Sequence, residues 1–229
     1  MEKLRPDHGV ATIERALRYM AIRVTSRPET RGMASELRAE RARLKDTDEM
    51  WLEARETRIA ATAEVEYLDE RLGSDVMSVC RAALALVKDG NREDERYKRL
   101  IGPVSPSEAL VPVGGEEQTR FVRTFIAQLT SEGGPFPELA DRAPVVQASL
   151  TALNEAEARR NALYVPEGTA AAERTAARDR ARRLYNLMHP RLQLAFPDDE
   201  RLVESFFAKI AAPRKKPAEA VEDEGEEEA

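Results

Sequence analysis

The sequence is poor in the residue types that build metal sites, disulfides and catalytic centres. Its 229 residues include one cysteine and two histidines, and only 5% are aromatic. A single cysteine, Cys80, excludes an internal disulfide, and with two distant histidines it fits no common zinc-ligand spacing. A di-metal helical bundle would need Glu-x-x-His twice, but Arg5 and Asn186 stand three residues before His8 and His189. We therefore expect no metal and no other cofactor.

Long apolar runs are also missing. The longest, AALALV at 82–87, is far shorter than the roughly 20 residues that cross a bilayer. The first residues, MEKLRPDHG, lack the apolar core of a secretory signal. These two features predict a cytoplasmic protein with no membrane partner.

Recognisable catalytic patterns are absent from the sequence. Gly114-Gly115 is not followed by Lys and Ser or Thr, so no phosphate-binding loop is indicated. Cys80 lies between Val76 and Val87 on an apolar helix face, where a thiol is usually an inert core group. His189 precedes Pro190 at an expected helix end, a position more typical of a structural histidine than of a base. We expect no enzyme, although carboxylates brought together from separate helices would leave no sequence pattern.

The residues that are abundant favour helices. Charged residues make up 34% of the chain, and Ala, Arg, Glu and Leu dominate. We predict an all-α fold, an antiparallel up-and-down helical bundle of six to eight helices that includes one very long helix over 27–72. A capping box at Ser26 and Glu29 should begin that helix, and Gly73-Ser74 should end it and reverse the chain.

Apolar spacing predicts the other helices and the domain boundaries. A capping box at Ser105 and Glu108 predicts one helical turn, Val165–Gly168 should break the helix of 141–164, and His189-Pro190 should bend or end the next one. The expected helices span 10–25, 76–87, 93–101, 116–131, 141–164, 169–189 and a last segment after Asp199. The expected domains are an N-terminal helical subdomain over 1–101, a Pro/Gly-rich linker over 102–115, a C-terminal helical subdomain over 116–211 and a disordered charged tail over 212–229.

The order of helices in the two halves is similar enough to suggest an internal duplication. Each half begins with a medium apolar helix and continues with a longer charged one. Arg15-Ala16-Leu17-Arg18 matches Arg120-Phe121-Val122-Arg123, but other identities are sparse. The alternative is that any antiparallel bundle shows the same rhythm.

Charge along the long helix runs against the helix dipole. Residues 27–45 have a net charge of +3 and residues 46–72 a net charge of −6, whereas the dipole favours acids first. Five i, i+4 steps pair like charges, such as Glu49 with Glu53, and only Lys45 with Glu49 pairs opposite charges. The helix therefore needs counter-charges from elsewhere.

Two sources of counter-charge remain open. In an antiparallel homodimer, the basic half of one helix would face the acidic half of the other. Alternatively, neighbouring helices of the same chain would supply the charges. Trp51 would be a contact residue in the first case and a packing anchor in the second. The candidate protein interface comprises Arg38, Arg41, Arg43, Glu49, Trp51, Glu53 and Glu56.

A second charged feature is a basic helix face comprising Arg174, Arg178, Arg180, Arg182 and Arg183. Three of these arginines are four residues apart, so they share one side of a helix. The face could be a solvated surface, a contact for nucleic-acid phosphates, or a docking site for the acidic run Glu222–Glu228 of the chain's own tail.

The sequence favours a non-enzymatic helical scaffold or adaptor that binds a protein partner or itself. The alternative is a nucleic-acid-associated or regulatory protein that uses the basic face, with the acidic tail masking or tuning it.

Overall fold

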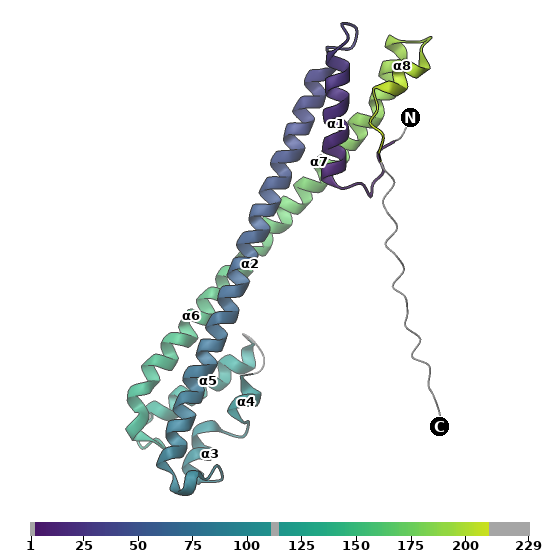
Figure 1. The fold of residues 1–229 in the computed structure, drawn as a ribbon. Coiled ribbons are helices and arrows are strands. Elements are labelled where there is room, and N and C mark those ends of the chain that lie inside the picture. The colour runs from purple at the N-terminus through teal and green to yellow at the C-terminus, as the bar shows by residue number, and fades with distance from the viewer. Residues whose placement is uncertain (1–2, 111–114, 211–229) are drawn as a thin grey trace, which may run out of the picture. The chain divides into compact units, whose positions relative to one another are not determined.

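The computed structural model describes residues 3–110 and 115–210. Within these residues the chain forms eight α-helices, two short 3-10 helices and no strand (Figure 1). The predicted all-α helical bundle is therefore confirmed. The α-helices are α1 (Val10–Thr25), α2 (Met33–Leu86), α3 (Glu95–Ile101), α4 (Pro106–Ala109), α5 (Glu116–Thr130), α6 (Ala143–Ala162), α7 (Tyr164–Ala195) and α8 (Glu200–Ser205), and the 3-10 helices are η1 (Lys88–Gly90) and η2 (Pro137–Arg142).

The chain forms two compact units, and both draw on the two halves of the sequence. The first unit contains residues 3–46 and 175–210 of the described chain, and the second contains Thr47–Arg174. The helices α2 and α7 each contribute one part to either unit. These boundaries differ from the expected one at 102–115, which lies inside the second unit. The 111–114 part of that linker and the tail at 212–229 lie outside the described residues.

The first unit is a small bundle of α1, the N-terminal part of α2, the C-terminal part of α7 and α8. The α1 helix runs antiparallel to α2 beside it (Figure 1). Every third or fourth residue of α1 is buried, including Ile13, Leu17, Met20 and Val24, which shows why its 3.6-residue apolar spacing forms a helix. The core also includes Leu37, Leu44, Ala177, Ala181, Tyr185, Met188, Leu192, Val203 and Phe206.

The second unit has a separate core around the C-terminal part of α2. That part packs against α5, α6, η2 and α3, and Cys80 lies in this core, as expected for a cysteine on an apolar helix face. Phe125 and Phe136 are its largest fully buried side chains. The core also includes Val65, Leu72, Val76, Val79, Cys80, Ala83, Leu100, Val122, Leu129, Val146, Leu150 and Leu153.

The bounds predicted for the long helix are wrong at both ends. Residues 26–32 form turns, in which the buried Thr30 hydroxyl donates to the Val24 carbonyl oxygen, and the helix begins at Met33. At the other end α2 continues through Gly73-Ser74 to Leu86. The flanking Leu72 and Val76 are both fully buried, and their packing outweighs the helix cost of one glycine, which is about 1 kcal/mol.

Of the two interruptions predicted in the later helices, the first is displaced to Leu163 and the second does not end its helix. Val165–Gly168 lies at the start of α7, where Pro166 needs no intrahelical N–H partner because it occupies the first turn. Only Leu163 separates α6 from α7, and Thr169 donates to the Val165 carbonyl oxygen inside the helix rather than capping it. Pro190 lies inside α7, which continues to Ala195, so the helix does not end at His189-Pro190, and a bend there stays a prediction.

Several local predictions are confirmed. The helix over 10–25 has the predicted bounds, and that over 116–131 differs by one residue. The Ser105 hydroxyl accepts a hydrogen bond from the Glu108 N–H, and the Glu108 carboxylate accepts one from the Ser105 N–H. This reciprocal capping box begins the short helix α4. No helix among the described residues is both long enough and apolar enough to cross a membrane.

Candidate functional site

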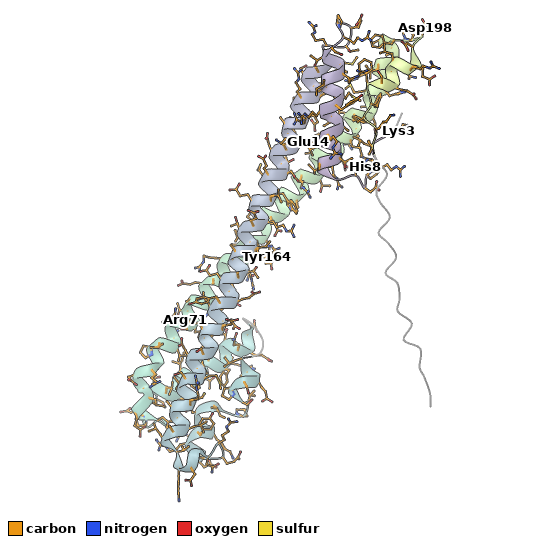
Figure 2. All side chains as sticks on the ribbon, in the orientation of Figure 1. Lys3, His8, Glu14, Arg71, Tyr164 and Asp198 are labelled. Carbon is orange, nitrogen blue, oxygen red and sulfur yellow. The ribbon has the colours of Figure 1, made fainter. Side chains whose placement is uncertain are left out.

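The basic part of α2 is neutralised largely within the first unit. The Arg41 guanidinium donates two N–H bonds to one Glu14 carboxylate oxygen, at 2.9 and 2.6 Å. Glu14 lies on α1 (Figure 2). Arg43 pairs with Glu40 at 3.3 Å, and Arg38 donates to the Thr25 hydroxyl at 2.9 Å. Neighbouring helices and residues of the same chain therefore supply partners for the three arginines of the candidate interface.

The acidic part of α2 behaves differently. Asp48 and Glu64 pair with Arg174 and Arg159, at 2.5 and 2.7 Å, and Arg58 pairs with Glu167. No ion pair of Glu49, Glu53 or Glu56 occurs within the described part of the chain. All three glutamates are exposed. The acidic half of the candidate interface is thus still available for a partner.

Trp51 belongs to neither core, and its role as a contact residue of an interface stays a prediction. Its side chain is half-buried, with the Arg174 guanidinium 4.0 Å from the ring centroid and the Arg55 guanidinium at 5.3 Å. Cations over an indole face are favourable contacts, and Arg174 is also the partner of Asp48. Trp51 therefore belongs to a polar contact between α2 and α7 instead of an apolar core.

Residues 47–64 of α2, which we call the open segment, contain no buried residue. Both cores are absent from this stretch, and its contacts with α6 and α7 include the ion pairs and the Trp51 contact described above and the Arg58 guanidinium 5.4 Å from the Tyr164 ring centroid. Exposed ion pairs stabilise far less than buried apolar side chains do. Met50, Leu52 and Ile59 are exposed at 53%, 42% and 51%, so apolar surface remains uncovered here.

One face of the open segment combines apolar and charged side chains. Leu52, Arg55, Glu56 and Ile59 have the spacing i, i+3, i+4 and i+7, which places them on the same side of a helix. All four are exposed. We call this set the 52–59 face; sequence analysis missed it because the stripe through Leu44, Trp51 and Val65 dominates the periodicity.

Most of the predicted basic face is engaged within the chain. Arg174 pairs with Asp48 in the second unit. In the first unit, Arg180 and Arg182 lie 3.5 and 3.6 Å from Glu40 and Asp179. Arg178 and Arg183 have no ion pair among the described residues, and the Arg178 Nε is buried without a hydrogen bond. Fewer cations are therefore available for phosphate groups than the sequence suggested.

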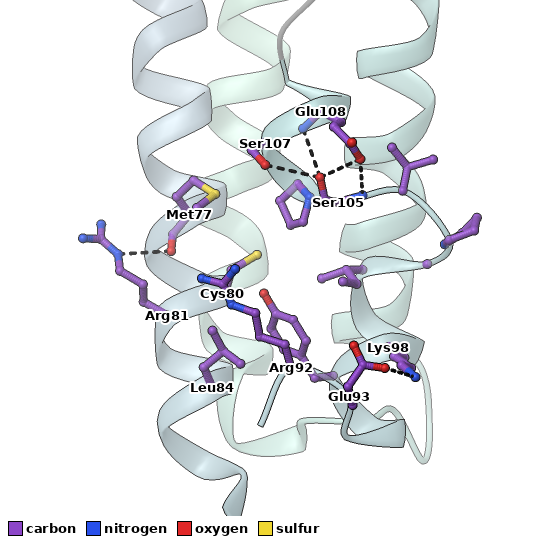
Figure 3. A pocket seen from close by; sticks show the side chains of 16 residues that line it. Met77, Cys80, Arg81, Leu84, Arg92, Glu93, Lys98, Ser105, Ser107 and Glu108 are labelled. Carbon is purple, nitrogen blue, oxygen red and sulfur yellow. Dashed lines mark hydrogen bonds and ion pairs between the residues drawn. The ribbon is translucent and has the colours of Figure 1, made fainter. Parts of the chain in front are cut away.

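A cavity of about 730 Å³ opens in the second unit (Figure 3). One side is formed by α2 through Met77, Cys80 and Leu84, and the other by α3 and the residues before it, through Arg92 and Tyr97. Residues 101–108, with α4, close a third side. The cavity lies wholly within one unit.

Cys80 and Tyr97 supply buried polar groups to this cavity, 1% and 5% exposed. Burial raises the pKa of the Cys80 thiol to about 11, and a hydrogen bond with Tyr97 opposes that rise. Burial also raises the pKa of Tyr97. Both groups are therefore protonated at neutral pH, and the thiol is not a nucleophile.

We predict that the native Cys80 thiol resists modification by thiol reagents. At about pH 8 a disulfide reagent should label it only after denaturant is added, because the protonated thiol is buried. Between about pH 9, where an unfolded thiol ionises, and about pH 11, where the folded one does, the free energy of unfolding should fall with rising pH. Rapid stoichiometric labelling of the native protein would contradict this prediction.

The two histidines have structural surroundings. The His8 Nδ1 accepts a hydrogen bond from the Arg5 backbone N–H at 3.2 Å, and the His189 ring lies 5.7 Å from the Phe207 ring. No group of three or more His, Cys, Asp or Glu side chains among residues 3–110 and 115–210 could hold a metal ion. Comparisons of the chain with protein-family models, with curated proteins and with solved structures found no match.

Proposed function

We propose that this protein is a non-enzymatic scaffold that associates with a second copy of itself through the 52–59 face. The observation that supports the proposal is the open segment of α2, which has uncovered leucine and isoleucine side chains and unpaired glutamates within a long stretch that lacks a core. Apolar side chains that repeat on one helix face are typical of contacts with another helix.

The 52–59 face is complementary to itself in one antiparallel arrangement. A two-fold axis between residues 55 and 56 would place Leu52 opposite Ile59 of the second copy and Arg55 opposite Glu56. Four apolar side chains would then be covered and two ion pairs would form. The same register sets Glu49 opposite Thr62 and Glu53 opposite Arg58, so directly opposed positions bring no acids together.

This arrangement differs from the interface expected from sequence. It retains Glu56 and leaves Glu49, Glu53 and Trp51 beside the contact, but it does not use Arg38, Arg41 and Arg43, which already have partners in the first unit. We choose a second copy as the partner because the face is its own complement. It carries one base and one acid, and two apolar residues, so each group on one copy meets a matching group on the other. An unrelated helical protein with the same pattern is the alternative occupant.

Nucleic acid is the less favoured partner. Binding to the phosphate backbone needs several free cations on one surface. Arg174, Arg180 and Arg182 are already in ion pairs, which argues for the scaffold rather than for a phosphate-binding face. The acidic run that was expected to mask the basic face lies outside the described residues.

Sedimentation velocity with an Ile59→Asp variant tests the proposal. The wild-type chain of 25.6 kDa should sediment as a dimer, and the variant should weaken dimerisation roughly 100-fold because a carboxylate would be buried against Leu52. Leu194→Asp is the matched control, since Leu194 is 85% exposed and lies outside the face. A wild-type protein that stays monomeric at every concentration and salt level would refute self-association.

A further inference from the structure

We propose that the cavity lined by α2, α3 and α4 is a binding site for a small amphipathic carboxylate, whose charged group contacts Arg92 and whose apolar body lies along Leu84, Ile101 and Val104. This site is independent of the 52–59 face, because none of its lining residues belongs to the open segment. Its volume of about 730 Å³ falls within the range of about 300–1,000 Å³ that is usual for small-molecule sites.

The acidic groups of the cavity already have partners. Glu93 pairs with Lys98 at 2.6 Å, and that contact lowers the pKa of the Glu93 carboxyl and raises the pKa of the Lys98 amine. The Glu108 carboxylate accepts a hydrogen bond from the Ser105 hydroxyl at 2.7 Å as part of the capping box. Figure 3 shows both contacts at the edge of the cavity. Neither carboxylate is free to balance another cation.

The Arg92 guanidinium has neither a carboxylate partner nor a hydrogen bond to the backbone in the part of the chain that the structure describes. No ion pair of Arg92 occurs within the described residues, although two carboxylates line the same cavity. Its side chain extends toward the α2 side of the cavity (Figure 3). Arg81, by contrast, donates to the Met77 carbonyl oxygen of its own helix at 3.3 Å. Arg92 is therefore the anchor for an anionic group.

The Tyr97 hydroxyl and the Cys80 thiol add neutral polar groups near Arg92. Arg92 interacts electrostatically with Tyr97, which lies on α3 and is hydrogen-bonded to Cys80 of α2. An arginine can bind a carboxylate with two parallel N–H bonds, and the Tyr97 hydroxyl, hydrogen-bonded to Cys80, puts no negative charge beside that carboxylate. Phosphates are less suited to this site, because no glycine-rich backbone loop of α2 or α3 supplies further N–H donors.

The rest of the lining determines the apolar part of the ligand. Leu84, Ile101, Pro103 and Val104 contribute hydrocarbon surface, and Val104 is 45% exposed at the opening. Contact with an apolar chain would remove that surface from water, which favours binding. A carboxylate without a hydrocarbon body would gain only the Arg92 contact, so both parts of the ligand are needed.

Octanoate is a suitable probe. Titration calorimetry on the full chain should detect octanoate binding, with much weaker binding of 1-octanol, which lacks the charge, and of acetate, which lacks the chain. Arg92→Gln should weaken octanoate binding at least tenfold through loss of the charge-assisted bonds. Arg99→Gln is the matched control, because Arg99 is an exposed arginine of α3 that does not line the cavity.

Amide chemical shifts locate the bound octanoate. The shifts that change should map to residues 77–108 in the wild-type protein, and Arg92→Gln should keep a folded spectrum because Arg92 is exposed. Equal affinity of the Arg92→Gln and Arg99→Gln variants would overturn the proposal. So would shift changes confined to the open segment, or acetate binding as tightly as octanoate. None of these outcomes bears on self-association through the 52–59 face.

Discussion

Replacing Tyr185 by alanine should lower the free energy of unfolding of the first unit far more than any substitution at the surface. The Tyr185 side chain is fully buried, and its ring meets the Phe207 ring edge-on at a centroid distance of 5.3 Å. Its hydroxyl accepts a hydrogen bond from the Ala208 backbone N–H at 3.1 Å. Tyr185 therefore connects α7 to the residues that follow α8. Removing such a large buried ring costs about 3–5 kcal/mol of unfolding free energy.

Urea denaturation followed by circular dichroism measures this cost. Tyr185→Phe should lose far less, about 1–2 kcal/mol, because the ring remains and only the hydrogen bonding of the hydroxyl, including the bond from Ala208, is lost. Tyr67→Ala serves as the control, since Tyr67 is 63% exposed and its truncation should change stability by less than about 0.5 kcal/mol. Hydrogen exchange should show that Tyr185→Ala loosens α1 and α8. Equal stability of Tyr185→Ala and Tyr67→Ala would contradict this assignment of the core.

Substituting Gly73 by proline should destabilise the second unit by about 3 kcal/mol or more. Proline in a helix interior removes one backbone hydrogen bond and clashes with the preceding turn. Gly73 lies inside α2, and the buried Leu72 and Val76 on either side of it belong to the core of this unit. A helix broken at this point would withdraw both side chains from their contacts.

Gly73→Ala should change the free energy of unfolding in the opposite direction, and it is the matched comparison for Gly73→Pro. A Cβ at this position would meet no heavy atom within 4 Å, and its backbone is not in the left-handed region. Alanine should therefore raise the free energy of unfolding by about 0.5–1 kcal/mol. If the chain instead reversed at Gly73 through a left-handed glycine, alanine would destabilise it. Thermal denaturation of the two variants distinguishes a continuous α2 from a turn.

Gly73 also illustrates what sequence reasoning can and cannot supply. Apolar spacing predicted α1 and α5 closely, and the Ser105–Glu108 capping box predicted α4, because these signals are local. Glycine and proline at 73, 166 and 190 also resembled local stop signals, but all three are inside helices. Tertiary packing decides such cases, and a single sequence does not reveal which side chains will pack around them.

The candidate sites were predicted only in part, for a related reason. The charge imbalance of the long helix was visible in the sequence, but its partners come from residues far away in the chain, such as Glu14 for Arg41 and Arg174 for Asp48. Exposure of Leu52 and Ile59 depends on which stretch of α2 lacks covering helices. The cavity at Arg92 depends on how α3 and α4 pack against α2. The ion-pair partners, the exposed apolar residues and the cavity cannot be predicted from the spacing of residues in the sequence.

A charge-swap experiment at residues 55 and 56, followed by sedimentation equilibrium, tests the proposed self-association most directly. Arg55→Glu alone and Glu56→Arg alone should each be monomeric, because like charges would meet across the two-fold axis. The two single variants should form a heterodimer when mixed, and the double variant Arg55→Glu/Glu56→Arg should dimerise by itself. Single variants that dimerise as tightly as the wild-type chain, or that fail to associate when mixed, would contradict the antiparallel 52–59 contact.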